Sequence, residues 1–227
     1  MQRPKKLVRL NLLLIGLLLL SIAVIDKPLA VFVNAKLTSV QPFFYNFTLA
    51  ADNITNHSFY LLLLYCGLGL PFLFKRRTRR LAFVLLTVVF ALLASAFLTN
   101  TMKFEFKRAR PDVYLKSEGK AADFYNGGSR DYSFPSAHTS FYLSLFLPGA
   151  LVFKRFAPAL LVIPGVVIIG RVVQNDHYLS DVLCSIIIVL NLCCLILGLF
   201  YLLDSKLKVK VANSKMKKAA DNIALVK

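Results

Sequence analysis

Charged residues are scarce in this sequence. Only 17% of its 227 residues are Asp, Glu, Lys or Arg, against roughly 25% in a typical soluble domain. Hydrophobic residues make up 57% of the chain, and the mean hydropathy is +0.65. This composition argues against an ordinary soluble domain and is typical of an integral membrane protein.

Acidic residues are the scarcer of the two charges. The chain has 11 Asp and Glu against 28 Lys and Arg, which gives a formal net charge of +17. Such an excess suits a nucleic-acid-binding protein, but most of these basic residues gather at the ends of apolar runs. They lie in four segments, 3–9, 75–80, 154–155 and 206–227. Their placement therefore indicates membrane topology, and nucleic acid is not an expected partner.

Cysteine pairs with metal-ligand spacing are also missing. The four cysteines, Cys66, Cys184, Cys193 and Cys194, all lie inside apolar runs, with no CxxC pair and no neighbouring histidine. Neither a zinc site nor a disulfide framework is expected. We interpret them as small core residues, and we expect no metal and no cofactor.

Long apolar runs are what the sequence does contain. The hydrocarbon core of a bilayer is about 30 Å thick and takes roughly 20 helical residues to cross. We predict an all-α, polytopic membrane helical bundle in which residues 1–227 form a single membrane-embedded domain. Its six transmembrane helices are expected at 7–25, 59–74, 81–98, 139–153, 157–173 and 179–203.

The basic segments predict how these helices are oriented. Lys and Arg stay on the cytoplasmic side of a membrane, which places the basic N-terminus (1–6) and the basic tail (205–227) inside and leaves three exterior loops. The N-terminus also resembles a signal peptide with a weak cleavage site near 33–35, but an uncleaved span is favoured. The first exterior loop, 26–58, suits a helix lying in the membrane interface.

The very short third exterior loop, "GRVVQNDHYLSD", carries charges that are expensive near hydrocarbon. His177 and Asp181 are spaced i, i+4, so on a helix they share a face and the carboxylate can hold one imidazole nitrogen. Arg171 would point about 240° away from His177 on a continuous helix. We therefore expect a helix break between them. Asp176 is interpreted as a solvated turn residue.

The second exterior loop, about 99–136, contributes two further segments. It begins with Lys103 and Arg110-Pro111 and ends in "PSAH", residues 135–138. Pro135 suits a first helical turn, with Ser133 or Ser136 as its cap. A helix start binds phosphate through its unpaired N–H groups. Cations and two histidines in this arrangement suit a phosphate ester, with one histidine attacking phosphorus and the other protonating the departing oxygen.

These three segments together resemble the signature of the type 2 phosphatidic acid phosphatase superfamily, which includes six-span lipid phosphate phosphatases and soluble vanadate-dependent haloperoxidases. The resemblance implies that His177 is the nucleophile, oriented by Asp181, and that His138 is the general acid. It also implies that the phosphoryl group is bound without a metal by Lys103, Arg110, Ser136, Ala137 and Arg171.

Two positions depart from the usual family pattern. Ala137 stands where glycine is commonest. The alanine adds a methyl group, but its backbone N–H remains available. Gly170 stands where a serine usually precedes the arginine, which removes a hydroxyl that would touch phosphate. Neither departure changes a charged residue, so we expect activity to survive.

The expected function is metal-independent hydrolysis of a lipid phosphate at the periplasmic face of a bacterial inner membrane, through a phosphohistidine. The substrate and the bilayer are the expected partners. Lipid A phosphate is favoured because the second exterior loop offers extra cations: Lys107, Arg108, Lys116, Lys120 and Arg130. Alternatives are an undecaprenyl pyrophosphate or phosphatidylglycerophosphate phosphatase, a lipid-to-lipid phosphotransferase, and a non-catalytic anion-binding or transport protein.

Overall fold

The described part of the chain is helical throughout. The computed structural model describes residues 4–75, 77–118, 123–125 and 132–224, and in these ranges no strand occurs. Two short elements interrupt the α-helices, a π-helical turn η1 and a 3-10 turn η2. The elements are α1 (Pro4–Leu20), η1 (Ser21–Ile25), α2 (Asp26–Lys36), α3 (Gln41–Asn56), α4 (Ser58–Phe74), α5 (Arg79–Phe106), α6 (Pro111–Lys116), α7 (Ala137–Val152), η2 (Lys154–Phe156), α8 (Ala157–Val173) and α9 (Leu179–Ala224).

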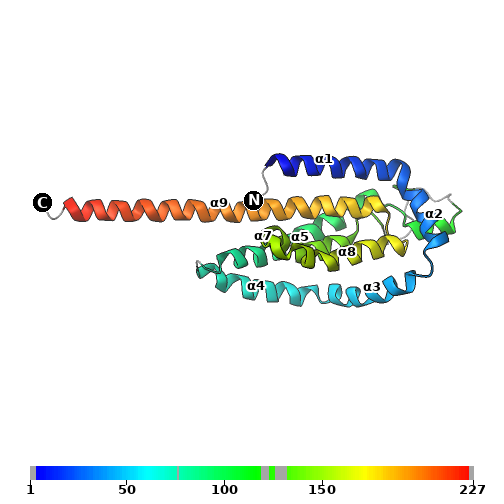
Figure 1. Cartoon of the computed structure of the whole chain (residues 1–227), viewed down its shortest axis with the longest axis horizontal. Helices are drawn as coiled ribbons and strands as arrows, with labels where there is room; N and C mark the ends of the chain where they lie inside the picture. The colour runs from blue at the N-terminus through cyan, green and yellow to red at the C-terminus, as the bar shows by residue number, and fades with distance from the viewer. Residues whose placement is uncertain (1–3, 76, 119–122, 126–131, 225–227) are drawn as a thin grey trace.

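The long helices run side by side and form an elongated bundle (Figure 1). Helix α5 contacts α4, α7 and α9, and α7 also packs on α8. Helix α1 lies along α9 on one side, while α3 and α4 follow one another along the opposite side, with α3 against α8. Helix α2 crosses one end of the bundle, and α9 projects far beyond the other end.

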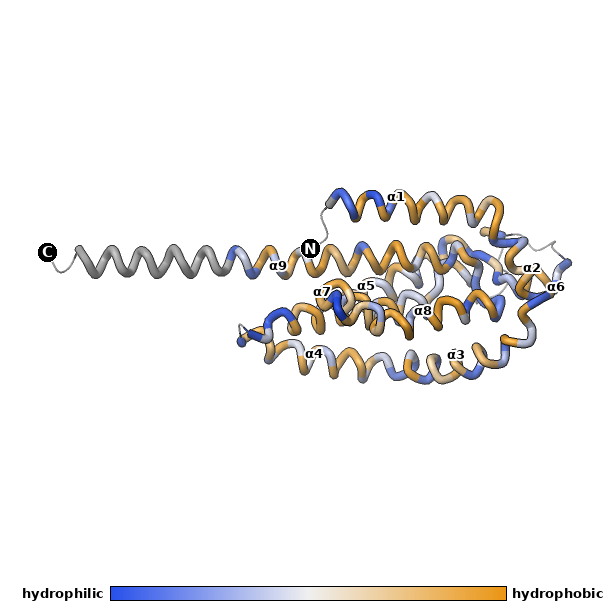
Figure 2. Tube along the Cα trace, in the orientation of Figure 1, coloured by the Kyte–Doolittle hydropathy of each residue, from blue (hydrophilic) through white to orange (hydrophobic). Residues whose placement is uncertain are grey.

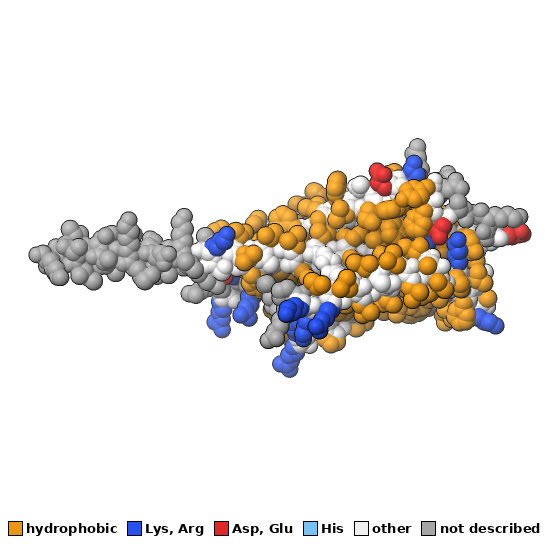
Figure 3. All heavy atoms as spheres, turned by 90° about the horizontal axis from the view of Figure 1, so that it is seen from above, with side chains coloured by type: hydrophobic (Ala, Val, Ile, Leu, Met, Phe, Trp, Pro, Cys, Tyr) orange, Lys and Arg blue, Asp and Glu red, His pale blue; other side chains and the backbone are white. Residues whose placement is uncertain are grey.

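The outer surface of the bundle is covered largely by apolar side chains. Apolar residues follow the helices along most of their length, and polar residues concentrate toward their ends (Figure 2). Large apolar side chains on the outside stay exposed, among them Leu12 at 65% and Phe97 at 70%. The space-filling view shows this apolar surface with Lys and Arg near both ends of the bundle and apolar side chains between them (Figure 3). A helix that is apolar all round suits a lipid environment.

The predicted spans all fall on helices, but their lengths differ. Within the described residues, four helical stretches are long and apolar enough to cross a membrane: Lys5–Lys36, Arg79–Lys116, Lys154–Val173 and Leu179–Lys206. The pair α3 and α4 qualifies as a fifth span bent by 61°, and α7 is apolar but only 16 residues long. The helical membrane architecture is therefore supported, while the number of six spans and the orientation of the termini stay predictions.

The first exterior loop folds into two helices instead of the single interface helix expected from the sequence. Helix α2 crosses the bundle end, whereas α3 packs along α8. Gly170 allows this close approach, because a Cβ at that position would lie 3.0 Å from Cδ1 of Phe44 on α3. Gly170, which replaces the serine common in the family, therefore faces α3.

One arginine joins elements from distant parts of the chain. Arg108 is completely buried, at 0% exposed. Its Nη2 lies 2.8 Å from Oδ2 of Asp26 on α2, its Nε 2.7 Å from Oδ1 of Asp123, and its Nη1 2.6 Å from Oδ1 of Asp181 on α9. The expectation that Arg108 offers its charge to a lipid headgroup is wrong, because the buried carboxylates need that charge as their counter-ion.

Aromatic rings and a hydroxyl complete the surroundings of this guanidinium. Its Cζ lies 4.6 Å from the ring centroid of Phe124 and 4.1 Å from that of Tyr178. Nη1 also donates to Oγ of Ser180 at 2.6 Å. We call Arg108 with Asp26, Asp123 and Asp181 the arginine cluster.

We predict that Arg108→Met strongly lowers the thermal stability of the protein in detergent. The substitution leaves buried carboxylates without a counter-charge, which typically costs about 3–5 kcal/mol. The stability of Arg108→Lys should lie between those of Arg108→Met and the wild type, because lysine keeps the charge but lacks the planar guanidinium group. The midpoint can be followed by reaction of a fluorogenic thiol dye with the buried Cys184 and Cys193 as they become exposed.

The matched control is Lys107→Met, which removes the neighbouring cation from an exposed position. Its unfolding midpoint should equal that of the wild type. Equal midpoints for the Arg108→Met and Lys107→Met variants would contradict the structural role of the arginine cluster.

Candidate functional site

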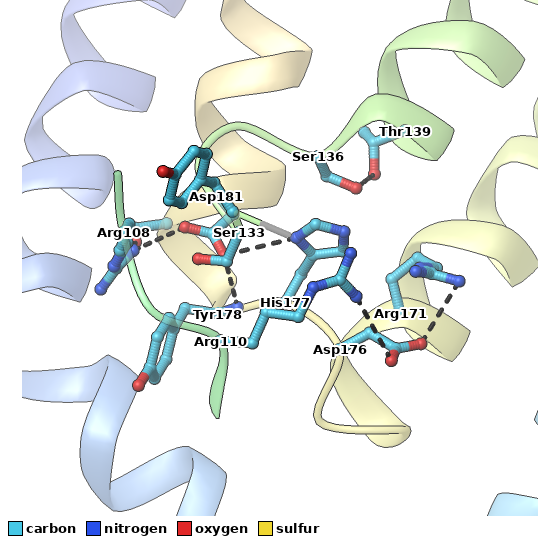
Figure 4. Close-up of polar contacts among 12 residues, drawn as sticks. Arg108, Arg110, Ser133, Ser136, Thr139, Arg171, Asp176, His177, Tyr178 and Asp181 are labelled. Atoms are coloured by element: carbon cyan, nitrogen blue, oxygen red, sulfur yellow. Dashed lines mark hydrogen bonds and ion pairs between the residues drawn. The ribbon is translucent and has the colours of Figure 1, made fainter. Parts of the chain in front are cut away.

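Three segments that are distant in sequence meet at one end of the bundle (Figure 4). The first links the end of α5 to α6 and carries Lys103 and Arg110. The second is the start of α7, and the third is the turn between α8 and α9. The segments identified from the sequence therefore converge on one place.

The turn between α8 and α9 breaks the helix where the sequence required it. Helix α8 ends at Val173, and the amides of Asp176 and His177 both donate to the carbonyl of Arg171, at 3.2 and 3.1 Å. Asn175 takes a left-handed backbone conformation with φ of 57°, which asparagine tolerates better than most residues. The predicted break between Arg171 and His177 is confirmed.

His177 is buried beneath the cations of the site and is only 2% exposed. Its Nδ1 lies 3.5 Å from Oδ2 of Asp181 and has no hydrogen-bond partner among the described residues. Burial lowers the pKa of His177 well below its usual value, and Arg171, Lys103 and Arg110 lower it further. The imidazole is therefore neutral near pH 7 and keeps a lone pair.

Asp181 is held from several directions as well as lying next to His177. Its Oδ2 accepts a hydrogen bond from the amide of Tyr178 at 2.8 Å, and its Oδ1 is bound by Arg108. The orienting carboxylate is thus part of the arginine cluster. Its position under the imidazole is set by this cluster rather than by His177 itself.

The start of α7 is fastened to α9. The helix begins at Ala137, with Ser136 as the residue before it. The amide of Ser136 donates to the carbonyl of Asp181 at 3.3 Å, and its own carbonyl accepts from Oγ of Ser185 at 2.9 Å. Helix N-termini carry free N–H groups and a positive dipole end, both of which attract phosphate.

Two details of this helix start differ from the sequence prediction. Pro135 precedes the helix and does not occupy its first turn. Ser136 stands at the capping position without a side-chain cap, because its Oγ is engaged by Oγ1 of Thr139 at 3.1 Å. Ser133 donates to the carbonyl of Ala109 and so is not the cap either.

The two arginines of the site share a carboxylate. Nη1 of Arg110 lies 3.6 Å from Oδ1 of Asp176, and Nη1 of Arg171 lies 3.3 Å from Oδ2 of the same residue. Lys103 donates through Nζ to the carbonyl of Tyr132. The interpretation of Asp176 as a solvated turn residue is wrong, because its carboxylate bridges the guanidinium groups of Arg110 and Arg171.

A cavity of about 740 Å³ opens above these residues. Arg110, His138, Arg171 and Asp176 line it, while His177, Ser136 and Asp181 are buried and do not. Helix α3 and the residues before it supply the opposite wall: Thr38, Gln41, Pro42, Tyr45, Asn46, Thr48, Leu49 and Asp52. This wall was not anticipated from the sequence.

Asp52 is the residue of the site that sequence reasoning missed. Its Oδ1 contacts Nε2 of His138, and it lines the same cavity as Arg110 and Arg171. The signal was faint but present, because the chain has only 11 acidic residues and this one lies in a largely apolar stretch. A carboxylate in such a place needs a partner.

The arrangement is suited to binding a dianion and breaking its ester bond. Cations and a helix N-terminus lie around the buried imidazole of His177, and a second imidazole, that of His138, lines the cavity together with Arg110 and Arg171. Within the described ranges, no group of three or more His, Cys, Asp or Glu side chains is arranged to hold a metal ion.

Comparison with known proteins gives matches over the same part of the chain. The model of the PAP2 superfamily matches residues 84–205. The lipid A 1-phosphatase of Rhizobium johnstonii is 32% identical over 105 residues, which is 46% of this chain and 41% of that protein. The lipid A 1-phosphatase of Rhizobium etli is 31% identical over 105 residues, 46% of this chain and 44% of that protein. The similarity thus spans less than half the length of these relatives, and no solved structure matches the chain.

The matched region contains all three segments of the site. Lys103, Arg110, Ser136 to His138, Arg171, His177 and Asp181 all lie between residues 84 and 205. Because the family model covers more than half of the chain and includes every one of these positions, the chain belongs to the PAP2 superfamily.

Proposed function

We propose that this protein hydrolyses a phosphate monoester on a membrane lipid headgroup through a phosphohistidine at His177. The observation that carries the proposal is the imidazole of His177, which is buried next to a cavity lined by Arg110, His138 and Arg171. Burial and the charges of Arg171, Lys103 and Arg110 lower its pKa, so the imidazole stays neutral near pH 7. Cations in this position stabilise the charge that develops on the phosphoryl oxygens, while the neutral imidazole has a lone pair to donate.

In the first step, Nε2 of His177 attacks phosphorus, and the bond from phosphorus to the leaving oxygen breaks as the new P–N bond forms. His138 donates its proton to that oxygen, so the lipid departs as an alcohol. Lys103 and the two arginines hold the non-bridging oxygens, helped by Ser136 and the backbone N–H of Ala137 at the start of α7. Asp181 stabilises the positive charge that His177 acquires, since Nδ1 lies 3.5 Å from its carboxylate.

In the second step, water attacks phosphorus and the P–N bond breaks. His138, now neutral, accepts the proton of the water. The electron pair of the P–N bond returns to His177, and phosphate leaves. The residues of this scheme bring about both steps without a metal ion.

The proposed substrate is a lipid A phosphate presented at the periplasmic face of a bacterial inner membrane. The two relatives named lipid A 1-phosphatase support this choice. Of the extra cations expected to favour a multiply anionic headgroup, Lys107 and Lys116 are exposed, although Lys116 pairs with Asp112 at 3.0 Å. Arg108 is buried, and Lys120 and Arg130 lie outside the described residues.

Phosphate release by the detergent-purified protein in the presence of EDTA tests the mechanism. We expect His177→Ala to reduce release from lipid A by a factor of 10³ or more, because the nucleophile is lost. The matched control is His57→Ala, which removes an exposed histidine that contacts the carbonyl of Asn53 and stacks on Tyr60, and should leave release unchanged.

The same assay with undecaprenyl pyrophosphate and phosphatidylglycerophosphate decides the substrate, and transfer of radiolabelled phosphate to a second lipid would reveal a phosphotransferase. Release that EDTA abolishes, or that the His177 variant retains, would overturn the mechanism. Absence of turnover on every lipid would favour a binding or transport protein.

The depressed pKa of His177 predicts how activity depends on pH. Protonation of His177 removes its lone pair, and because its pKa lies well below 6.5 this loss occurs at a pH below the ordinary range of histidine. With p-nitrophenyl phosphate, whose leaving group needs no proton, we expect kcat/KM to stay constant from about pH 8 to pH 6. A decline centred near the ordinary histidine pKa of about 6.5 would contradict the burial and charge of this residue.

Removal of Asp176 should strengthen the binding of phosphate. Its carboxylate occupies Arg110 and Arg171, so a phosphate group must displace it. Because Asp176 is partly exposed, each contact is worth at most about 1 kcal/mol. We expect the inhibition constant of inorganic phosphate to fall about fivefold in Asp176→Asn and to stay unchanged in Asp112→Asn, whose carboxylate pairs with Lys116. Weaker inhibition in Asp176→Asn would show that the carboxylate orients the arginines instead of competing with phosphate.

A further inference from the structure

We propose that Asp52 of α3 is a positioning residue for His138, holding Nε2 of the imidazolium so that the Nδ1 proton is delivered to the leaving oxygen. The inference rests on the proposed function, which makes His138 the proton donor. Asp52 lies outside the residues matched by the family model, 84–205. It is therefore a feature of the N-terminal part of this chain and not of the shared signature.

The electrostatics of the cavity create the need for such a residue. A proton donor must carry its proton before it acts, but burial and, after it, the like charge of Arg171 on α8 lower the pKa of His138. Positive neighbours disfavour an imidazolium, and a carboxylate in contact favours it. A carboxylate beside His138 therefore opposes this lowering and raises the population of the protonated imidazole.

Two carboxylates influence His138, and their contacts differ. Asp176, in the turn after α8, acts at longer range and bridges Arg110 and Arg171. Asp52, from α3, contacts Nε2 of His138 directly. His177, also near His138, is neutral and adds no charge. The direct contact therefore assigns the role to Asp52.

Helix α7 holds Asp52 in place through a second contact one turn along. Tyr142 lies four residues after His138, on the same face of α7. Its hydroxyl donates to the carbonyl of Ala51 at 2.9 Å. The residue that follows Ala51 is Asp52, so the tyrosine fixes the backbone from which the carboxylate reaches His138.

Helix α8 holds α3 from the other side. Oγ1 of Thr48 donates to Oε1 of Gln174 at 3.1 Å, and Nε2 of Gln41 donates to the carbonyl of Val173 at 3.1 Å. The absence of a side chain at Gly170 lets Phe44 pack directly on α8. These contacts join α3 to α8, and that of Tyr142 joins it to α7, so Asp52 has a defined position although its side chain is 43% exposed.

The proton balance of the proposal is closed. In the first step Nδ1 of His138 gives its proton to the departing alkoxide, and the ring becomes neutral while Nε2–H stays bonded to Asp52. In the second step Nδ1 takes a proton from the attacking water and the imidazolium is restored. Asp52 itself gains and loses no proton.

The test compares Asp52→Asn on two substrates with different leaving groups, using kcat/KM because it reports the step that forms the phosphohistidine. With lipid A, whose leaving group needs a proton, we expect a loss of tenfold or more at pH 7.5. With p-nitrophenyl phosphate we expect a value within twofold of the wild type, which also shows that the variant is folded. The basic limb of the lipid A pH profile should move to lower pH by about one unit.

Two further variants give the matched comparisons. Asp52→Glu should recover part of the lipid A activity because it restores the carboxylate. Asp112→Asn, which removes an acidic charge that pairs with Lys116, should behave as the wild type on both substrates. Equal losses on both substrates in Asp52→Asn and Asp52→Glu would assign Asp52 a purely structural role and overturn the inference, as would an unchanged pH profile.

His138→Ala separates this inference from the proposed function. If the His138 variant loses kcat/KM on lipid A but keeps it on p-nitrophenyl phosphate, His138 is the proton donor and the result for Asp52→Asn decides the inference alone. If the His138 variant shows no dependence on the leaving group, the proposed role of His138 fails, and the inference about Asp52 fails with it.

Discussion

The ion pairs between the buried Arg108 and three carboxylates are the interaction on which the rest of the site depends. Arg108 contacts Asp26, Asp123 and Asp181 at 2.6–2.8 Å and is itself inaccessible to solvent. Taking these charges out of water is costly unless each is paired and hydrogen bonded. The cluster therefore tolerates few rearrangements, and it joins α2, the loop after α6 and the start of α9 in one geometry.

The position of the buried imidazole follows from this cluster. Asp181 is bound by Arg108 and by the amide of Tyr178. Its Oδ2 lies 3.5 Å from Nδ1 of His177. The start of α7 is attached to the same residue, since the amide of Ser136 donates to the carbonyl of Asp181. A single carboxylate residue thus links the arginine cluster, the buried histidine and the helix N-terminus.

Two of the chain's few acidic residues make specific contacts in the site. Asp176 bridges the two arginines of the site, and Asp52 contacts His138 across the cavity. Near hydrocarbon, a carboxylate without a partner is expensive. In a site rich in cations these acids balance charge on groups that the proposed mechanism requires in a defined protonation state or orientation.

The sequence by itself determined the helical membrane character, the three segments of the site and the break between Arg171 and His177. These features depend on local properties, namely the length of apolar runs, the angular spacing of residues on a helix and the cost of charge near hydrocarbon. Only the tertiary structure decided which charges meet. Arg108 pairs with Asp26 and His138 with Asp52, across separations of 82 and 86 residues, and such contacts depend on how α2 and α3 fold back against the bundle. No local pattern encodes that packing, which is why Arg108 was misread as a headgroup cation, Asp176 as a solvated turn residue, and Asp52 was not recognised at all.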